Sequence, residues 1–423
     1  MKFVSTTSKG PHRSFREAVL GNLPDDGGLY YPTEIPQLDQ GFLKQIPQLS
    51  LPEIALEVLA KFCSDDIDPN ELERISERVF DFPLPLKEVA DNIHCLELFH
   101  GPTFAFKDIG AKFLAACLAH FNQSENKATT VLVATSGDTG GAVANGFLGV
   151  EGVRVIILYP KGKVSNLQEK QLTTLGQNIT ALEIEGTFDD CQNLVKQAFA
   201  DKQLNKDIHL SSANSINIAR WLPQSLFYYV PLQQGYEDVT LSVPSGNYGN
   251  LTSGVLAMKM GVPISKFIAA SNANDVVPRY LNSGRYEPKS TIPTLANAMD
   301  VSDPSNYKRL LKLFDGKYEG IISKLIPFSL GDVEIKETIR DCYEANRYLL
   351  DPHSAIAYKA LHEMKKEGIF LGTAHYCKFL PTINEALGRE VAIPDFAKGL
   401  MHMEKRSIEL NADFAQFKEF LIG

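Results

Sequence analysis

Apolar and polar positions follow two different periods in two parts of the chain. Up to about residue 90, apolar side chains recur every three or four positions, which places them on one face of an α-helix. This pattern predicts helices over 14–20, 51–63 and 69–79. This part of the chain contains no residues that point to chemistry beyond that of a structural helical cap. We therefore predict a mainly helical N-terminal region over 1–92.

From about residue 128 onward, short apolar runs alternate with helical spacing. The run VRVIILY at 153–159 is apolar almost throughout, as expected for a strand buried on both faces. Strands are predicted over 131–134, 153–159, 179–184, 208–211, 239–243, 267–271 and 370–373, and helices over 142–148, 164–175, 188–201 and 251–260. Alternating strands and helices of this length imply parallel sheets with crossover helices, so the predicted fold class is α/β.

Length and proline content bear on the domain organisation. A chain of 423 residues exceeds what one compact core usually holds, so two or three domains are expected. The polar stretch 282–315 contains Pro288, Pro293 and Pro304. We predict that it is a long loop region over a site or an interface, and not a linker between domains.

Composition and charge narrow the class of protein. Hydrophobic residues make up 44% and charged residues 22%, as is ordinary for a soluble globular protein. A net charge of −9 without a basic stripe argues against a nucleic-acid partner. The chain has no long apolar run that would span a membrane and no apolar signal segment at its start. Its six cysteines form no CxxC pair, which favours free thiols in a reducing cytoplasm over disulfides or a metal site.

Lys107, in the stretch HGPTFAFKD, is the first candidate for chemistry. It follows a Gly-Pro turn, has Phe104, Phe106 and Ile109 as neighbours, and precedes a run with helical spacing. Burial at such a loop-to-helix junction would disfavour the charged ammonium and lower the lysine pKa. A neutral amine can attack a carbonyl and form a Schiff base, as the lysine of a pyridoxal-phosphate (PLP) enzyme must. The alternative is an ordinary lysine on a helix face.

Two glycine-rich loops lie between a predicted strand and a predicted helix. In SGNYGN at 245–250, glycines allow backbone N–H groups to close on a phosphate at a helix N-terminus. The loop is not GxGxxG, which disfavours a dinucleotide; the alternative is a plain glycine-rich turn. The second loop, TSGDTG at 135–140, offers hydroxyl and N–H donors without a cation, which suits a carboxylate. Two such loops suggest two anionic groups on the ligands.

A third cluster lies at 211–220, SSANSINIAR. Asn214 and Ser215 have the character of helix N-caps, and Arg220 follows close to two turns later. An arginine there could bind a phosphate through two parallel hydrogen bonds. A helix cap with a structural arginine is the alternative.

These motifs occur in the order HGPTFAFKD, SGDTGGA and SGNYGN, followed by GTAH at 372–375. In this combination the chain resembles the PLP-dependent enzymes of fold type II, the β-family, and within them the threonine synthases. Near the start, Ser5-Thr6, SFREAVL and PDDGGLYYP are also similar to that family. The resemblance runs from about residue 3 to at least 380, which is nearly the whole chain.

The resemblance implies a fold and its domains. We expect two parallel-sheet α/β domains of the fold-type-II kind, with the N-terminal region added to them. The large PLP-binding domain is predicted to comprise 93–110 and 215–423, and the small domain 111–214.

The resemblance also implies roles for individual residues. Lys107 corresponds to the Schiff-base lysine, and Thr373 to the hydroxyl that faces the pyridine nitrogen. The loop for the cofactor phosphate corresponds to Ser245, Gly246, Asn247, Tyr248, Gly249 and Asn250. The substrate positions are Thr135, Ser136, Gly137 and Thr139 for a carboxylate, and Asn214, Ser215 and Arg220 for a phosphate.

Asp138 departs from the common pattern. Many β-family enzymes carry an asparagine here, which hydrogen-bonds the ring oxygen of the cofactor. An aspartate would repel a phenolate unless it were protonated or turned away. Asp138 is therefore expected beside the cofactor, and both arrangements are open.

The implied activity converts O-phospho-L-homoserine and water to L-threonine and phosphate. The amine, carboxylate and phosphate of that substrate match the lysine, the neutral donor loop and the arginine. A related phospholyase that releases 2-oxobutanoate and ammonia is an alternative, because the two differ only in water access at one step. A non-catalytic binding protein of the same fold is another, which an intact Lys107 with both loops disfavours. The expected partner is the small-molecule substrate alone, bound by a monomer or homodimer.

Overall fold

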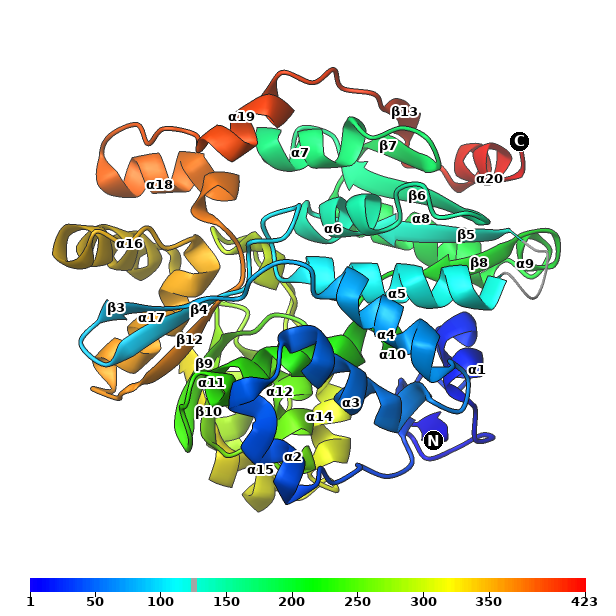
Figure 1. Cartoon of the computed structure of the whole chain (residues 1–423). Helices are drawn as coiled ribbons and strands as arrows, with labels where there is room; N and C mark the ends of the chain where they lie inside the picture. Colours follow the sequence, from blue (N-terminus) through cyan, green and yellow to red (C-terminus); the bar gives the residue numbers. More distant parts are fainter. Residues whose placement is uncertain (123–127) are drawn as a thin grey trace.

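The computed structural model describes residues 1–122 and 128–423 of the chain (Figure 1). Its strands form a short N-terminal pair and two larger sheets, against which helices pack. Strands within the two larger sheets are almost all parallel. The predicted α/β class is therefore confirmed.

The N-terminal region contains the predicted helices. It consists of β1 (Phe3–Ser5), α1 (Phe15–Gly21), β2 (Tyr30–Pro32), α2 (Gln40–Gln45), η1 (Ile46–Gln48), α3 (Leu51–Cys63) and α4 (Pro69–Val79). The side chains of Ser14, Ser50 and Asp68 accept backbone N–H groups at the starts of α1, α3 and α4. In α1 and α3 a glutamate in the first turn completes a capping box, so these helix starts are encoded locally.

This region shares its core with the rest of the molecule. Phe15 of α1 is fully buried, with its ring centroid 6.3 Å from that of Phe113 and 6.2 Å from that of Phe121. Both partners belong to α5 (Lys107–Asn122), and α4 packs against the same helix. The N-terminal helices thus hold the helix that begins at Lys107.

The larger sheet runs in the order β11-β10-β9-β12-β4-β3, with only β3 and β4 antiparallel. Its strands are β3 (Leu86–Ala90), β4 (Ile93–Glu97), β9 (Val239–Pro244), β10 (Ile264–Ser271), β11 (Leu325–Ser329) and β12 (Gly368–Gly372). Its helices are α12 (Gly249–Met260), α13 (Val276–Ser283), α15 (Tyr318–Lys324), α16 (Asp332–Asn346), α17 (Pro352–Glu363) and α18 (Leu380–Leu387). Because β12 pairs with β4 and β9, the segments that follow these three strands leave the same edge of the sheet.

The smaller sheet is parallel throughout and runs in the order β13-β7-β6-β5-β8. Its strands are β5 (Thr129–Ala134), β6 (Val153–Pro160), β7 (Ile179–Glu185), β8 (His209–Ser212) and β13 (Ile408–Asn411). The helices around it are α5, α6 (Asp138–Gly146), α7 (Asn166–Thr173), α8 (Phe188–Ala200), α9 (Leu204–Asp207), α19 (Asp395–Met401) and α20 (Phe414–Ile422). A connecting segment of α10 (Ile218–Trp221), η2 (Leu222–Tyr229) and α11 (Val230–Gln233) leads to the larger sheet.

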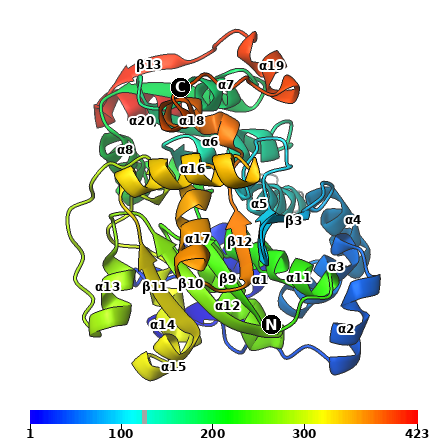
Figure 2. The ribbon, with the colours of Figure 1, turned by 90° about the vertical axis from the view of Figure 1, so that its left-hand side faces the viewer.

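The C-terminal end differs from the predicted domain boundaries. β13 pairs with β7, and Phe417 and Leu421 of α20 pack into the core beneath the smaller sheet. Figure 2 shows β13 and α20 together with α8, above the strands of the larger sheet. The last residues therefore lie with the small sheet and not with the large domain predicted for 215–423. At the other end, β3 joins the larger sheet, although 86–90 was assigned to the N-terminal region.

The stretch 282–315 is irregular over most of its length but contains η3 (Asn297–Met299) and the helix α14 (Tyr307–Leu313). The prolines obscured this short helix, which begins three residues after Pro304. Tyr307 stacks on Tyr286, with ring centroids 3.9 Å apart. The loop is thus anchored by aromatic packing and is not a linker.

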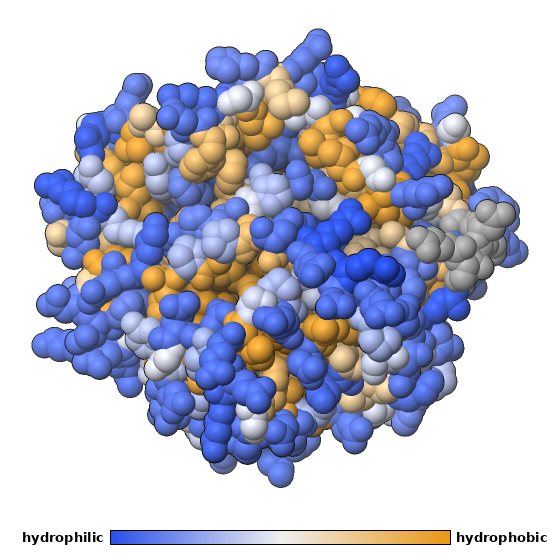
Figure 3. All heavy atoms as spheres, viewed as in Figure 1, coloured by the Kyte–Doolittle hydropathy of each residue, from blue (hydrophilic) through white to orange (hydrophobic). Residues whose placement is uncertain are grey.

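The surface carries few large apolar side chains. On the face shown in Figure 3, hydrophilic residues cover most of the area, and apolar residues show mainly in hollows between them. Within the described ranges, no helix is both long and apolar enough to cross a membrane. All six cysteines are free and buried.

We predict that Phe15→Ala lowers the free energy of unfolding by about 3–5 kcal/mol, because it empties a buried ring site between α1 and α5. Urea unfolding followed by the fluorescence of Trp221, the single tryptophan, measures the change. Val333→Ala, at a position that is 65% exposed, is the control and should change little. Equal stability of the Phe15→Ala protein and the parent would contradict the role given to α1.

Candidate active site

Lys107 is the first residue of α5, at the predicted loop-to-helix junction. The segment before it is tied to the segment after β12. The Phe106 N–H donates to the Thr373 carbonyl at 3.0 Å, and the His375 N–H donates to the Phe104 carbonyl at 3.0 Å. Phe104 has a left-handed backbone with φ of 59°, which turns the chain into the helix. Two positions more than 260 residues apart, Lys107 and Thr373, are thereby brought together.

The Lys107 amine lies in a largely dry setting. Only 16% of its side chain is exposed, and Nζ lies 5.8 Å from the centroid of the Phe106 ring. Burial lowers the pKa of Lys107, and the Asp138 carboxylate, whose Oδ2 is 3.9 Å from Nζ, partly offsets that effect. The predicted depression of this pKa is confirmed.

The loop at 135–140 connects β5 to α6. The Thr135 hydroxyl oxygen accepts the N–H groups of Gly137 and Gly140, both at 2.9 Å, so Thr135 shapes the loop from within. Gly137 has φ of 135°, and a Cβ there would lie 2.5 Å from the Gln168 side chain. Ser136 and Thr139 keep partial exposure and are the hydroxyls of this loop that can meet a ligand.

Asp138 is ionised and has a counter-ion that the sequence analysis missed. Its Oδ1 lies 2.9 Å from Nζ of Lys378, a fully buried lysine, and accepts a hydrogen bond from Gln168 Nε2 at 2.9 Å. Lys378 and Lys107 hold the pKa of Asp138 well below its usual range, against the opposing effect of burial. The carboxylate is therefore not protonated, and one oxygen is engaged by Lys378. The signal was a lysine amid apolar residues in YCKFL, the same signal that identified Lys107.

The loop at 245–250 joins β9 to α12, and backbone groups line it. Tyr248 precedes the helix with φ of 60°, and no side chain caps the helix N-terminus. Most side chains of the loop point to protein partners instead: Ser245 to the Val243 carbonyl, Asn247 to Ser215 and the Ser305 N–H, Tyr248 to Ser271, and Asn250 to Tyr228. Uncapped N–H groups at the start of a helix are the donors that a phosphate requires.

The stretch 282–315 closes against this loop. A Cβ on Gly246 would lie 2.5 Å from the Cα of Met299, so only glycine allows this approach. The Ser305 N–H donates to Asn247 Oδ1 at 2.6 Å. The stretch therefore lies over the loop at 245–250.

The cap of α10 is not where it was predicted. Asn217, and not Asn214 or Ser215, accepts the Ala219 N–H and begins the helix. Asn214 and Ser215 form the turn before it, and Ser215 accepts a hydrogen bond from Asn247 Nδ2 at 2.7 Å. Asx and serine side chains can cap at several neighbouring positions, so spacing alone misplaced the cap. The turn nevertheless lies beside the loop at 245–250.

Arg220 is buried without full compensation of its charge. One terminal nitrogen donates to the Ala213 carbonyl, while Nε has no hydrogen-bond partner among the described residues. Gly110 of α5 allows this approach, since a Cβ there would lie 3.0 Å from Nε. Burial lowers the pKa of Arg220 to about 10, and the nearby Asp108 opposes the shift. A buried guanidinium with an unused donor fits an anionic ligand.

Arg309 of α14 was also missed, because it lies in the stretch predicted as loop. It is fully buried, and its nitrogens donate to the carbonyls of Tyr30, Ser215 and Ile216 and to Asn306 Oδ1. Every nitrogen of this guanidinium is engaged by protein. Arg309 therefore holds the 215 turn in place and leaves no donor for a ligand.

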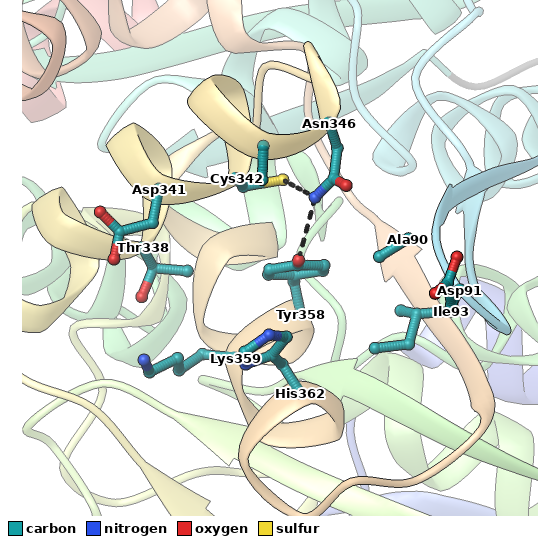
Figure 4. Close-up of a pocket in the computed structure, with 11 residues that line it drawn as sticks. Ala90, Asp91, Ile93, Thr338, Asp341, Cys342, Asn346, Tyr358, Lys359 and His362 are labelled. Atoms are coloured by element: carbon teal, nitrogen blue, oxygen red, sulfur yellow. Dashed lines mark hydrogen bonds between the residues drawn. The ribbon is translucent and has the colours of Figure 1, made fainter.

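An open cavity of about 370 Å³ lies elsewhere, between α16, α17 and the β3–β4 turn (Figure 4). In Figure 4 the Asn346 amide points toward Tyr358 and Cys342 and bonds to both. None of the residues that line this cavity is a predicted site residue. None of its lining residues carries a buried polar side-chain atom without a hydrogen-bond partner in the described part of the chain.

The residues around Lys107 fit PLP. A buried amine of lowered pKa can bond the aldehyde carbon, and the uncapped start of α12 can receive the phosphate. Thr373, 6% exposed, follows β12 beside the lysine segment and offers an uncharged hydroxyl. Arg220 has a further buried donor without a protein partner among the residues that the structure describes.

We predict that Gly246→Ala weakens retention of PLP, because the new methyl group would push the Met299 backbone away from the phosphate loop. The ratio of bound cofactor to protein after dialysis measures the effect. Gly249→Ala is the matched comparison in the same loop: its Cβ would meet Ser215 at an ordinary 3.4 Å, so the loss should be smaller. A larger loss with Gly249→Ala would show that Met299 does not define the loop.

Comparison with known proteins agrees with this site. A family model for pyridoxal-phosphate dependent enzymes matches residues 78–377. Models for the threonine synthase N terminus and for the C-terminal part of threonine synthase match 2–80 and 354–421. Threonine synthase from Haemophilus influenzae is 44% identical over 417 residues, which cover 97% of this chain and 96% of that protein.

Two solved structures share the whole fold. The crystal structure of threonine synthase from Escherichia coli has a TM-score of 0.92 and 41% identity, and the match covers 100% of this chain and 99% of that one. The structure of PLP-bound threonine synthase from Brucella melitensis has a TM-score of 0.95 and 35% identity, with the same coverage. With three family models and full-length relatives in agreement, the chain belongs to the threonine synthase family of pyridoxal-phosphate-dependent enzymes.

Proposed function

We propose that this chain converts O-phospho-L-homoserine and water to L-threonine and phosphate. The observation that carries the proposal is the convergence of a buried amine, two loops at helix starts and a buried, partly unpaired arginine. These groups complement the amine, carboxylate and phosphate of the substrate. When bound, PLP would supply an electron sink for the carbanion that forms as the substrate loses a proton.

Lys107 has the setting of a proton carrier. Its amine would hold the cofactor covalently. Its freed amine would then remove a proton at the α-carbon and later act at the β-carbon. Burial lowers its pKa and so favours the neutral amine that such a base requires.

The loop at 135–140 would bind the substrate carboxylate. Ser136 and Thr139 offer hydroxyls, and Gly137 lies at the N-terminus of α6. The negative charge of Asp138 in this loop would repel a carboxylate, but Lys378 neutralises it at 2.9 Å. The hydroxyl and N–H donors of the loop would therefore remain available to the substrate carboxylate.

Arg220, Asn214 and Ser215 would hold the phosphate of the substrate. Arg220 has an unused Nε, and the 215 turn is rigidly placed by Arg309. The side chain of Ser215 touches Asn247 of the cofactor-phosphate loop, so the two anion sites are neighbours. Phosphate leaving against a buried cation is stabilised as its charge develops.

The cofactor phosphate would be bound by 245–250, mainly through backbone N–H groups. Gly246, Gly249 and Asn250 would contribute N–H donors, since the side chains of Ser245 and Tyr248 are turned to protein partners. Thr373 would face the pyridine nitrogen with a neutral hydroxyl. We also propose a cytoplasmic location, which six free cysteines support.

Product analysis with O-phospho-L-homoserine tests the proposed function. We expect threonine and phosphate in equal amounts, and neither from Lys107→Ala. Release of 2-oxobutanoate and ammonia as the main products would favour the phospholyase instead. Absence of turnover together with tight substrate binding would favour a binding protein.

We predict that Arg220→Lys raises the KM for the phosphorylated substrate about tenfold or more while PLP content stays normal. Loss of a charge-assisted contact with phosphate costs about 1.5–3 kcal/mol. Steady-state kinetics and the absorbance of bound cofactor give the two values. Arg78→Ala, at an exposed position on α4, is the control. An unchanged KM for Arg220→Lys would move the phosphate site elsewhere.

We predict that Thr373→Asp reduces threonine formation and speeds conversion of the cofactor to its amine form. A carboxylate at this position would keep the pyridine nitrogen protonated and favour proton return to the cofactor carbon. Thr373→Ser keeps the hydroxyl and should retain most activity. Rates and cofactor spectra identical to those of the parent in Thr373→Asp would show that this residue does not face the ring.

A further inference from the structure

Lys378 is a buried cation that none of the predicted roles uses. It lies in η4 (Tyr376–Phe379), just after the GTAH segment, and its side chain is 0% exposed. Nζ donates to the Thr103 carbonyl at 2.7 Å and to Gln171 Oε1 at 3.0 Å, and lies 2.9 Å from Asp138 Oδ1. An ammonium has three donors, so these three neighbours occupy it fully. Lys378 therefore acts on the site through its neighbours.

The main neighbour is Asp138, which is held by one oxygen only. Oδ1 accepts from Gln168 Nε2 and pairs with Lys378, whereas Oδ2 lies 3.9 Å from Nζ of Lys107. Gln168 binds Asp138 and Gln171 binds Lys378. Both glutamines belong to α7, so the same helix holds both members of the pair. The free oxygen of the carboxylate thus faces the amine of Lys107.

The arrangement crosses the two α/β blocks. Asp138 begins α6 beside the smaller sheet, and Lys378 follows the larger sheet through the segment after β12. Thr103 also binds the neighbouring Asp108 through its N–H and hydroxyl, which fixes the carbonyl that Lys378 contacts. Lys378 is therefore positioned on three sides by buried polar groups.

We propose that Lys378 is a positioning residue that holds Asp138 as an anion with Oδ2 directed at Lys107, so that Asp138 stabilises the proton which the freed Lys107 amine takes up. The proton moves from the substrate carbon to Nζ, stays there as an ammonium, and returns to carbon later; Asp138 remains ionised throughout. Lys378 limits the attraction so that Lys107 can release the proton again. The inference rests on the proposed function, in which Lys107 is the base.

Asp138 and Lys378 carry opposite charges, so they have opposite effects on the titration of Lys107. The charged groups that act on Lys107 are Asp138 on α6, which raises its pKa, and Lys378 on η4 and Arg220 on α10, which lower it. His353 of α17 lowers the pKa of Asp138 by its charge. Arg220, His353 and the desolvation of the site are common to every variant proposed below. Removing Asp138 or Lys378 should therefore shift the titration of Lys107 in opposite directions.

The test is the pH dependence of Lys107 acetylation in the full-length chain freed of cofactor, quantified by mass spectrometry. Exposed Lys289 in the same sample is the internal reference. We expect Asp138→Asn to lower the midpoint by about one pH unit and Lys378→Met to raise it by a similar amount. Combined in one chain, the two substitutions should return the midpoint near the parent value. Shifts of the two single variants in one direction, or no shift, would overturn the proposal.

Lys378→Arg keeps the charge and should keep the midpoint near that of the parent. If Lys378→Met does not fold, Lys378→Gln removes the charge with more polarity and must give the same upward shift. A purely structural Lys378 would alter the extent of labelling without moving the midpoint in opposite directions.

Product analysis separates this inference from the proposed function. Opposite shifts together with release of 2-oxobutanoate would keep the positioning role and reject threonine formation. Threonine formation without these shifts would keep the proposed function and reject the positioning role of Lys378. In the holoenzyme, the pH profile of kcat should move with the same signs, while KM for the substrate changes less.

Discussion

Removing positive charge from water is the constraint on which the centre of this protein depends. Lys107, Lys378, Arg220 and Arg309 are all buried or nearly so, and burial lowers the pKa of three of them, Lys107, Arg220 and Arg309. Protein groups satisfy every hydrogen-bond donor of two of the four: carbonyls and Asn306 bind Arg309, while Asp138, Thr103 and Gln171 bind Lys378. The other two keep unused capacity and face one site. The difference between satisfied and unsatisfied cations separates the supporting residues from those that can meet a ligand.

The fold serves this constraint by bringing distant segments together behind dry walls. Hydrogen bonds between 104–106 and 373–375 join the end of β12 to the start of α5. Arg309 reaches the N-terminal Tyr30 and the 215 turn at once, and its guanidinium lies 4.5 Å from the Trp221 ring centroid. The N-terminal region and the stretch 282–315 are thus parts of the wall around the site. Without them, water would reach the cations and restore their ordinary solvation.

The sequence predicted what local pattern determines. Helical spacing predicted α1 and α3, a continuous apolar run predicted β6, and Lys107 stood out by its apolar neighbours. It did not predict the pairing of β13 with β7, because a four-residue strand with mostly exposed side chains has no apolar signature. It missed Lys378 and Arg309 for a related reason. A buried cation is intelligible only once its partners are known, and these lie up to 279 residues away.

The Asp138–Lys378 pair illustrates why such features are retained at an active site. A buried ion pair contributes little net stability, because desolvation offsets the attraction, and apolar side chains of similar size often do as well. Removing one partner of such a pair, by contrast, destabilises the fold by about 3–5 kcal/mol, because the other charge is left buried and unpaired. Each charge is therefore retained only together with the other. A neutral amide at 138 would need no lysine at 378 and would leave Lys107 without an anion. An ion pair is thus not needed here for folding stability. Since Asp138 Oδ2 lies 3.9 Å from Lys107 Nζ, we infer that the charge of Asp138 serves proton transfer.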